Sequence, residues 1–393
     1  MKTSGRAGGA STRLRTLAVN GAVAAAATAA ALLLAELLLP RFVTIEQATL
    51  EYDELLGFRG RPNLGIPWTR EVEGPPRVVT TNSRGFHDHE RARRPAPGSR
   101  RIILLGDSFL EAYQVDIEAN FSQRLARGLS RRAAGEYEAV NWGVHGYGLG
   151  SHFLAVRERV AGWNPDCVVL VLFLGNDLQD NFAPLASASV PRFEMAEGEL
   201  TFFPAPPYSP RSWLRDNVLA RSAVARLVWK YAVKTNPGIA ALARDAGMIA
   251  TPDLAASEAH LEDMIAVAGR LLEGIAGHLR QREIGLFVYL IPDPLLLQDA
   301  IDIRRYRRDP GAPRPVFRRN RERIETGILK HLDGLQIEYA YPRELFIEQI
   351  ERGNGIYRGG YGHFTALAHE LSARLLADRL SASRFVRKDP GTS

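Results

Sequence analysis

Four short stretches of this sequence contain residues of the types that acyl transfer needs. Ser108 follows "RIILLGD", Gly146 lies in "NWGVHGYG", Asn176 in "LFLGND" and His363 in "GYGHFT". A serine hydroxyl can attack a carbonyl carbon when a nearby imidazole removes its proton. Backbone N–H groups and a carboxamide can then stabilise the oxyanion that forms. Each residue alone is more typical of a helix cap or a turn, so their common placement in the fold is what indicates a nucleophilic site.

Alternating strand and helix patterns must position these residues. Five short β-type runs are expected, several of them apolar without alternation, as in strands that are covered on both faces: Arg101 to Leu105, Tyr137 to Asn141, Cys167 to Phe173, Gly285 to Ile291 and Leu335 to Tyr339. Helical patterns occur at Phe121 to Ala134, Leu149 to Ala161, Ser257 to Gln281, Phe317 to Leu332 and Thr365 to Ser381. The alternation predicts an α/β protein, a three-layer α/β/α sandwich around a five-stranded parallel sheet.

The four candidate residues come directly after predicted strands or just before the final helix. In an open parallel sheet, ligands bind beyond the carboxyl ends of the strands. Ser108, Gly146 and Asn176 follow the first three strands, and His363 follows the last one. The pattern therefore predicts one site at one edge of the sheet.

With these blocks in this order, the sequence resembles the SGNH hydrolase superfamily, the GDSL-type esterases and lipases. The resemblance runs from about Asn82 to Leu380 with gaps. It implies a flavodoxin-like sheet, with Ser108 as nucleophile and His363 as base. It also implies that Ser108, Gly146 and Asn176 form the oxyanion hole. The contexts "TTNSRGFHDHE" and "NDLQDN" resemble those of a membrane-anchored subgroup.

The sequence departs from the family pattern just before His363. The family usually has an Asp two or three residues before this histidine, whereas this chain has Tyr361 and Gly360. Loss of such a carboxylate can cost about 10⁴ in turnover. Three explanations stay open: a backbone carbonyl orients the imidazole, a distant carboxylate does so, or hydrolysis has been lost. Asp293 and Glu344 are the candidate carboxylates. A smaller departure is Leu174, where a Gly often stands.

The N-terminal segment predicts a single membrane span. Residues 16–39 carry no charge except Glu36, and at about 1.5 Å per residue they can cross a hydrocarbon core of about 30 Å. The four basic residues in 1–15 indicate a cytoplasmic N-terminus and an extracytoplasmic or periplasmic body. We therefore predict a signal anchor, with a cleaved secretory signal as the alternative.

The rest of the chain divides into a flap, a core domain and a tail. Residues 40–99 are expected to form a linker and an N-terminal flap with a strand at Arg77 to Thr81, and 100–383 the SGNH-like domain. An insertion at 182–255 contains a hairpin in "RFEMAEGELTFF" and a helix near Asn217 to Val233, and is interpreted as a lid or substrate-selecting subdomain. Residues 384–393 are a C-terminal tail.

Charge and cysteine usage exclude several function classes. The net charge is +6, but Lys2, Arg6, Arg13 and Arg15 against Glu36 supply half of it, so bulk charge does not favour a nucleic-acid partner. The single cysteine, Cys167, allows no internal disulfide and no thiolate metal site.

The basic run from Arg304 to Arg323 is interpreted as a solvated loop, with contact to anionic lipid or an acidic polymer as the alternative. We expect neither a metal nor an organic cofactor.

The remaining histidines offer weaker candidates. His87 and His89 could form a metal pair, but no third ligand cluster accompanies them, so a solvated turn is favoured. His145 fits a pocket-lining position and a surface loop equally well. His369 lies about 600° round the final helix from His363 and is interpreted as structural.

Two acidic residues flank the candidate catalytic residues. Asp107 and Asp177 are expected to hold turns through side-chain hydrogen bonds to the backbone rather than to move protons.

Taken together, these features predict a membrane-anchored serine esterase that acts through an acyl-enzyme. Its location would make acyl groups on cell-envelope polysaccharide or lipid the substrates. An O-acyltransferase would use the same residues, and a non-catalytic glycan-binding module is the alternative suggested by the missing Asp.

Overall fold

A computed structural model describes residues 7–42, 48–72, 75–133, 135–219, 221–239, 260–297, 314–360, 362–383 and 385. They fall into two units: Met1–Ala48 with Tyr208–Leu242, and Thr49–Pro207 with Ala243–Ser393. All four candidate residues belong to the second unit, which contains the central sheet.

The central sheet has five parallel strands in the order β11-β10-β7-β5-β6. Their bounds are Ser99–Gly106 (β5), Glu136–Gly143 (β6), Cys167–Phe173 (β7), Gly285–Ile291 (β10) and Glu338–Ala340 (β11). Counted along the chain, this is the 2-1-3-4-5 order of the flavodoxin-like fold. The five predicted strands are confirmed, although the last one begins three residues later than expected.

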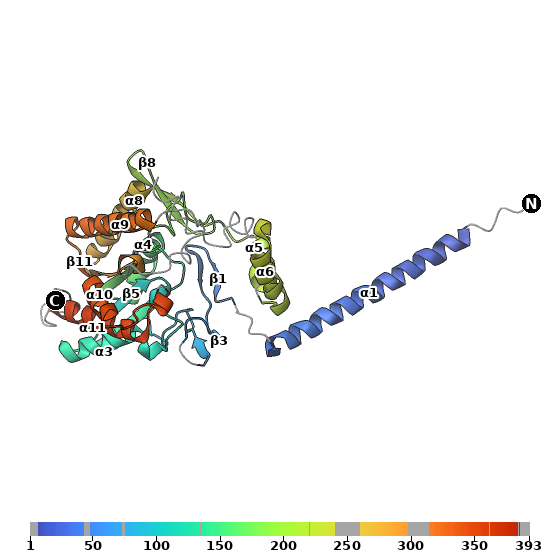
Figure 1. Cartoon of the computed structure of the whole chain (residues 1–393), viewed down its shortest axis with the longest axis horizontal. Coiled ribbons are helices and arrows are strands. Elements are labelled where there is room, and N and C mark those ends of the chain that lie inside the picture. The colour runs from blue at the N-terminus through green and yellow to red at the C-terminus, as the bar shows by residue number, and fades with distance from the viewer. Residues whose placement is uncertain are drawn as a thin grey trace, which may run out of the picture. The chain divides into compact units, whose positions relative to one another are not determined.

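Helices cover both faces of this sheet (Figure 1). On β5, Ile102 and Leu104 belong to one buried cluster, and Ile103 and Leu105 to another. The first cluster includes residues of α3 (Phe121–Arg132), α10 (Arg343–Glu351) and α11 (Ala366–Ala382), and the second includes residues of α4 (Leu149–Glu158), α8 (Leu261–Arg280) and α9 (Arg314–Gly334). Burial of each such side chain stabilises the fold by about 1.5–3 kcal/mol. The predicted three-layer sandwich is confirmed.

Two helices differ from the expectation. The basic run was expected to be a loop and a helix was expected from Phe317; α9 contains that predicted helix but begins at Arg314, inside the run, and residues 304–313 lie outside the described residues. Helix α10 was not predicted at all. The expected start of α8 at Ser257 also lies outside the described residues. Short 3₁₀ turns occur at Ile117–Ala119, Val160–Trp163, Pro294–Leu296 and Arg358–Gly360.

The segment before the sheet forms two antiparallel hairpins rather than a plain linker. They pair Leu50–Asp53 (β1) with Gly57–Gly60 (β2), and Gly65–Trp68 (β3) with Arg77–Thr80 (β4). Of these only β4 was predicted, as Arg77 to Thr81. The backbones of Gly60 and Gly85 approach so closely that a Cβ on Gly85, where φ is +90°, would lie 1.9 Å from the Gly60 carbonyl oxygen. This contact fixes β2 against the loop that follows β4.

The predicted hairpin in the insertion is confirmed as Arg192–Ala196 (β8) and Glu199–Phe203 (β9). The helix expected near Asn217 to Val233 is instead divided into a π-helical turn at Arg215–Leu219 and α6 at Ala223–Thr235, preceded by α5 at Pro210–Leu214. Residues 240–255 of the insertion lie outside the described residues. Of the insertion, β8 and β9 belong to the unit that holds the sheet, whereas α5 and α6 belong to the other.

Helix α1 (Ala7–Phe42) shares its unit with α6. Its segment Arg15–Phe42 is long and apolar enough to cross a membrane, and none of its most apolar window is buried. A signal sequence would meet the same criterion of length and composition, so both N-terminal predictions fit this helix.

Candidate active site

Ser108 begins a helix of a single turn, α2 (Ser108–Glu111), directly after β5. Asp107 caps this helix: its Oδ1 accepts the Phe109 N–H at 2.9 Å. The helix ends after one turn because Ala112 adopts the left-handed conformation, with φ of 54°. The sharp turn between strand and helix therefore leaves the Ser108 hydroxyl free of the capping role that its sequence position also allowed.

The Ser108 hydroxyl contacts His363. The His363 Nε2 lies 2.8 Å from Ser108 Oγ, although 255 residues separate the two in sequence. A weaker contact joins Ser108 Oγ to Asp107 Oδ2 at 3.4 Å. The imidazole ring also lies near the Phe109 ring, with centroids 5.1 Å apart. This geometry suits proton transfer from the hydroxyl to the imidazole.

Glu71 occupies the place of the carboxylate that the sequence lacks before His363. Its Oε2 lies 2.8 Å from His363 Nδ1 and also accepts the His363 backbone N–H at 2.9 Å. Glu71 lies between β3 and β4 in the flap, with φ of 56°, an uncommon value for a residue other than glycine. The structure thus contains a complete Ser–His–Glu arrangement, with the acid supplied from upstream of the serine.

The two carboxylates suggested by the sequence serve elsewhere or have no described contact with the histidine. Asp293 is buried, accepts the Leu295 N–H at 2.8 Å and pairs with Arg321 at 3.0 Å. Glu344 lies in the first turn of α10, and the described contacts of His363 do not include it. The expectation of Asp293 or Glu344 as the orienting group is therefore wrong. Tyr361 lies outside the described residues.

The charges of the pair stabilise each other. Burial favours the neutral imidazole, but the hydrogen bond and charge of Glu71, together with the charges of Asp107 and Glu111, raise the pKa of His363 above its ordinary value. Burial likewise opposes ionisation of Glu71, yet its bonds to His363 lower its pKa overall. An imidazolium formed during proton transfer would therefore be stabilised by an ionised Glu71.

The two other candidate oxyanion donors follow β6 and β7, the neighbours of β5 in the sheet. Gly146 has φ of +80° in the loop after β6, and a Cβ there would lie 3.3 Å from the Phe58 ring. Asn176 follows β7, and its Nδ2 donates to Asp180 Oδ2 at 2.5 Å. Because an amide nitrogen carries two hydrogens, this bond orients Asn176 and leaves it a second donor.

Buried carboxyl groups hold the turns beside the site. Asp177 Oδ2 accepts the Phe173 N–H at 2.7 Å, as Asp107 accepts that of Phe109. Both side chains make the backbone bonds predicted for them. Burial is the main cause that raises the pKa of Asp107 to about 6, that of Asp180 to about 7 and that of Asp177 well above its usual range. Glu71, which contacts His363, differs from these three carboxyl groups because its pKa is lowered.

A second histidine–carboxylate pair lies close to the site. His145 Nδ1 is 2.8 Å from Glu111 Oε2, and Glu111 is buried at the end of α2. Burial would lower the pKa of His145, but the charge and hydrogen bond of Glu111 raise it overall, while the charge of His363 works to lower it. His145 is half-buried in the loop before α4, and both expected positions, lining the pocket or lying in a surface loop, stay open.

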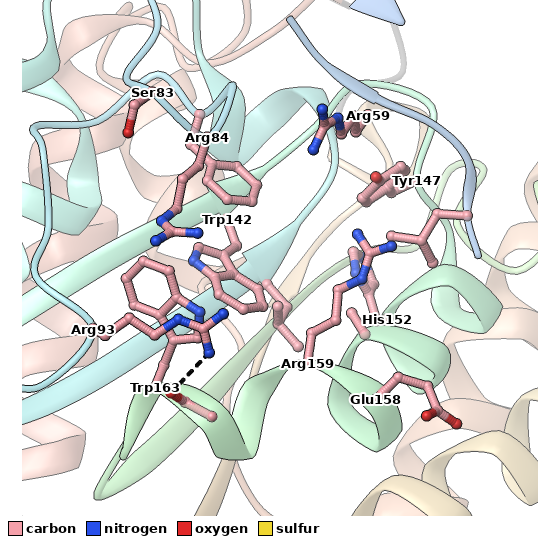
Figure 2. Close-up of a pocket in the computed structure, with 15 residues that line it drawn as sticks. Arg59, Ser83, Arg84, Arg93, Trp142, Tyr147, His152, Glu158, Arg159 and Trp163 are labelled. Atoms are coloured by element: carbon pink, nitrogen blue, oxygen red, sulfur yellow. Dashed lines mark hydrogen bonds between the residues drawn. The ribbon is translucent and has the colours of Figure 1, made fainter. Parts of the chain in front are cut away.

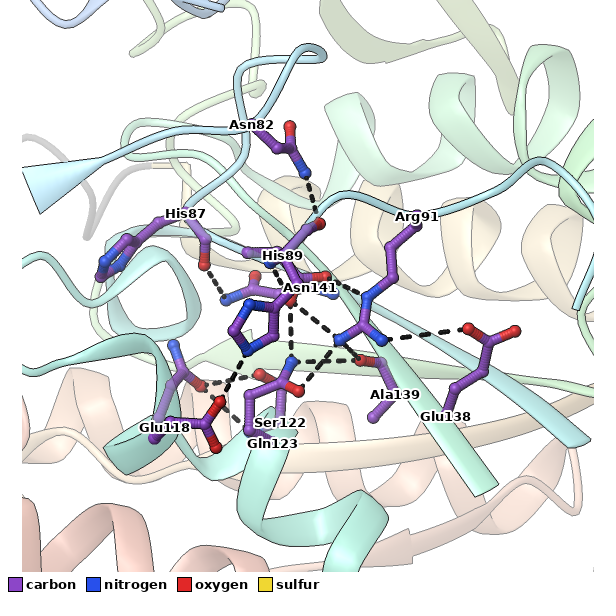
Figure 3. Close-up of polar contacts among 12 residues, drawn as sticks. Asn82, His87, His89, Arg91, Glu118, Ser122, Gln123, Glu138, Ala139 and Asn141 are labelled. Atoms are coloured by element: carbon purple, nitrogen blue, oxygen red, sulfur yellow. Dashed lines mark hydrogen bonds and ion pairs between the residues drawn. The ribbon is translucent and has the colours of Figure 1, made fainter. Parts of the chain in front are cut away.

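Residues of the "GFHDHE" segment make polar contacts with neighbouring elements, and its two histidines do not face a common ligand position (Figure 3). His87 Nδ1 bonds the Glu111 carbonyl at 2.8 Å, whereas His89 pairs with Glu118 at 2.7 Å, so the two rings serve different partners. Between them, the buried Asp88 accepts from Gln123 at 2.8 Å and from the Asn141 N–H at 3.0 Å. Among the described residues no cluster of three or more candidate metal ligands occurs.

His369 lies in the core, as predicted. It is buried, and its Nδ1 accepts the Phe121 N–H at 3.3 Å. Burial lowers its pKa to about 3, which keeps the ring neutral. Cys167 is also buried, at the start of β7, as a small apolar side chain.

The strand order and the position of each sequence block at a strand end are those of the flavodoxin-like sheet that the sequence resemblance implied. The structure is similar to a lipase from a goat rumen metagenome, with 12% identity, a TM-score of 0.41, and coverage of 74% of this chain and 100% of that one. It is also similar to a lipase/acylhydrolase from Enterococcus faecalis, with 12% identity, a TM-score of 0.38, and coverage of 75% of this chain and 100% of that one. A third similar structure is that of an acetylxylan esterase from Geobacillus stearothermophilus, with 11% identity, a TM-score of 0.39, and coverage of 74% of this chain and 99% of that one.

No family model matches the sequence, and no curated protein does. Overlaps at these identities and TM-scores do not assign an activity, so the chemistry has to follow from the residues of this chain.

Proposed function

We propose that this protein is a serine esterase of the SGNH type. The observation that supports the proposal is the chain of contacts from Ser108 through His363 to Glu71, with 2.8 Å at each step. A hydroxyl, an imidazole and a carboxylate in this order form the arrangement that activates a serine for attack on a carbonyl carbon. Glu71 also removes the reason for a non-catalytic interpretation, which was the missing carboxylate.

The reaction would proceed in two halves. His363 Nε2 takes the proton of Ser108 as Oγ bonds to the ester carbonyl carbon, and the imidazolium then gives that proton to the departing alcohol. The Ser108 N–H, the Gly146 N–H and the Asn176 amide would hold the carbonyl oxygen as it becomes negative. Water, activated by the same imidazole, then hydrolyses the acyl-enzyme. Glu71 remains ionised throughout and orients His363.

We infer that the site faces the outside of a cell membrane. The four basic residues before the apolar part of α1 favour a cytoplasmic N-terminus, so the unit with the sheet would lie on the other side. Acyl groups on envelope polysaccharide or lipid are then the accessible esters. Transfer of the acyl group to a sugar hydroxyl would use the same residues, with the sugar in the place of water.

The direct test is labelling by a fluorophosphonate probe together with hydrolysis of short p-nitrophenyl esters. Wild-type protein should be labelled and should release p-nitrophenol, and Ser108→Ala should do neither. Ser130→Ala, an exposed serine on α3, is the matched control and should behave as wild type. Equal inertness of the wild type and Ser108→Ala would rule out the esterase. Analysis of the product with a sugar present separates hydrolysis from transfer.

A further inference from the structure

A pocket of about 390 Å³ lies beside β6 and α4, and none of Ser108, His363 and Glu71 lines it (Figure 2). Its lining combines buried or partly buried aromatic side chains with arginines at its rim. The aromatic residues are Phe86, Trp142, Tyr147 and Trp163, and the arginines are Arg59, Arg84, Arg93 and Arg159. Mixed linings of this kind are typical of small-molecule sites, where aromatic surface holds a ring and a few polar groups orient it.

Two of the four arginines form ion pairs with carboxylates. Arg59 pairs with Glu51 at 2.7 Å, and Arg159 makes two bonds to Asp53 at 2.6 and 2.9 Å. Among the described residues neither Arg84 nor Arg93 forms an ion pair with a carboxylate; Arg84 lies close enough to Glu90 for its charge to act on that carboxylate, and Arg93 Nη1 donates to the Gly162 carbonyl oxygen at 3.4 Å.

The guanidinium groups of Arg84 and Arg93 both lie near the same indole. Arg84 stands over the Trp163 ring at 4.6 Å and Arg93 at 5.9 Å. Their N–H donors are therefore held together at the rim of the pocket by stacking. A guanidinium so placed favours a carboxylate or a phosphate, which it can bind through two parallel hydrogen bonds.

Buried polar atoms in the lining also lack partners. His152 is fully buried on α4, and neither ring nitrogen has a hydrogen-bond partner among the described residues. The Trp142 indole N–H is likewise buried without one. Because such groups cost free energy when unsatisfied, they point to a ligand that supplies the missing bonds. A hydroxyl group can both donate and accept a hydrogen bond, so hydroxyl groups of a ligand could accept from the indole N–H and bond to either nitrogen of the imidazole.

From this lining we infer that the pocket binds an acidic sugar, a hydroxylated ring that carries a carboxylate or a phosphate. Arg84 and Arg93 would bind the oxyanion, the Trp142 and Trp163 rings would contact the sugar, and His152 would meet a hydroxyl group. The inference is independent of the ester chemistry. Tyr147 links the pocket to the candidate active site, since it lines the pocket and directly follows Gly146 in sequence.

Calorimetric titration of the full chain in detergent micelles tests this site. Glucuronate and glucose 1-phosphate are the probes, with glucose lacking the oxyanion and inorganic phosphate lacking the ring. At least one acidic sugar should bind about tenfold more tightly than either control compound, and the tighter of the two identifies the oxyanion. If neither acidic sugar exceeds inorganic phosphate, the inference is wrong.

Variants make the assignment specific. Arg84→Ala/Arg93→Ala should weaken binding of the acidic sugar about tenfold or more, whereas Arg270→Ala, an exposed arginine of α8, should leave it unchanged. Ser108→Ala should bind as the wild type does, so a failed esterase and a failed sugar site give different results. Wild-type affinity in Arg84→Ala/Arg93→Ala would also overturn the inference.

A different observation carries a second inference, which rests on the proposed membrane anchor. The only charged residue of the predicted span, Glu36, contacts the start of α6: it accepts from Ser222 Oγ at 2.9 Å, from the Val224 N–H at 3.1 Å and from the Ala223 N–H. A carboxylate at a helix N-terminus is stabilised by the free N–H groups there. The outer end of α1 is therefore fixed to α6.

Large apolar side chains of this part of the insertion are exposed. They are Trp213, Leu214, Val218, Leu219, Val228, Trp229 and Tyr231. Tryptophan and tyrosine are enriched at membrane–water interfaces, and exposed apolar patches mark interaction surfaces. Because α6 is fixed to the end of the apolar helix, we propose that α5, the π-helical turn after it and α6 rest on the lipid surface that α1 enters. This part of the insertion would then be a membrane contact instead of a lid.

Quenching of tryptophan fluorescence by brominated lipid tests this contact. The full chain in brominated phosphatidylcholine vesicles should be quenched relative to unbrominated ones, and Trp213→Phe/Trp229→Phe should lose most of that quenching. Because α1 contains no tryptophan, flotation with vesicles reports the anchor separately. Equal quenching in the wild type and the double variant would overturn the proposal. Trp68→Phe is the control for the unit that holds the sheet.

Discussion

Glu71 and His363 stand 292 positions apart, and their contact is the feature of the site that sequence reasoning missed. The contact between Ser108 and His363 could be predicted, because one residue follows a recognisable strand and the other precedes a recognisable helix. The oxyanion role of Gly146 and Asn176 stays a prediction. Glu71 has no such signal, because its segment is short, polar and without periodicity. Its role depends on the fold of the flap over the serine turn, which local pattern does not encode.

The first residue-scale prediction concerns Glu71 itself. Glu71→Gln keeps the shape of the side chain but removes the charge that holds the imidazolium, so we expect kcat/KM on p-nitrophenyl acetate to fall by about 10²–10⁴. Glu344→Gln should leave kcat/KM unchanged. Similar losses in both variants would contradict the assignment of Glu71. Circular dichroism spectra of the two variants should match that of the wild type.

The second residue-scale prediction concerns pH. His363 must be neutral to accept the serine proton, and Glu71 raises its pKa. The wild-type rate of fluorophosphonate labelling should therefore fall as pH decreases through this raised pKa. In Glu71→Gln the stabilising charge is gone, so the same fall should occur at lower pH. An unchanged midpoint in Glu71→Gln would show that the carboxylate does not set the titration of His363.

At the scale of elements, the two hairpins of the flap decide whether the acid reaches the base. Strand periodicity predicted β4 and the whole central sheet, since buried parallel strands are long apolar runs. It did not predict β1, β2 and β3, which have four residues each and mixed burial. Their pairing depends on close backbone contacts such as that between Gly60 and Gly85, which a sequence does not display.

The element-scale prediction uses two glycines with similar backbone conformations. Gly85→Ala would force a Cβ against the Gly60 carbonyl, whereas Gly98, with φ of +80°, has open space around its Cβ position. Gly98→Ala should cost only the conformational strain, about 1 kcal/mol of unfolding free energy. Gly85→Ala should cost about 1–3 kcal/mol more and lower kcat, because Glu71 moves with the flap. Urea unfolding and esterase assays measure both effects, and equal stability of the two variants would contradict the contact.

At the scale of the whole molecule, the chain combines an apolar helix with a unit that contains all the residues of the proposed chemistry. The order of strands and helices was largely predictable, because alternation of apolar runs and helical periods leaves few topologies. The separate unit formed by α1 and α6 was not, because it joins residues almost 190 positions apart through Glu36.

The whole-molecule prediction separates anchoring from catalysis. Removal of residues 1–42 should release the protein from the membrane fraction, and kcat/KM on soluble short esters should stay within about twofold of the full chain. Removal of 1–15 alone keeps the apolar segment and serves as the control for truncation. Loss of esterase activity on removal of 1–42 would mean that α1 supports the catalytic unit directly.

The position of Glu71 has a consequence for recognising related sequences. When the acid is supplied ahead of the serine block, the residues immediately before the catalytic histidine are released from the requirement for a carboxylate. A search that demands an Asp beside the histidine would discard such chains as inactive. A better signature would pair the serine and histidine blocks with an acidic residue in a hairpin segment some 35–40 positions upstream of the serine, as Glu71 stands before Ser108.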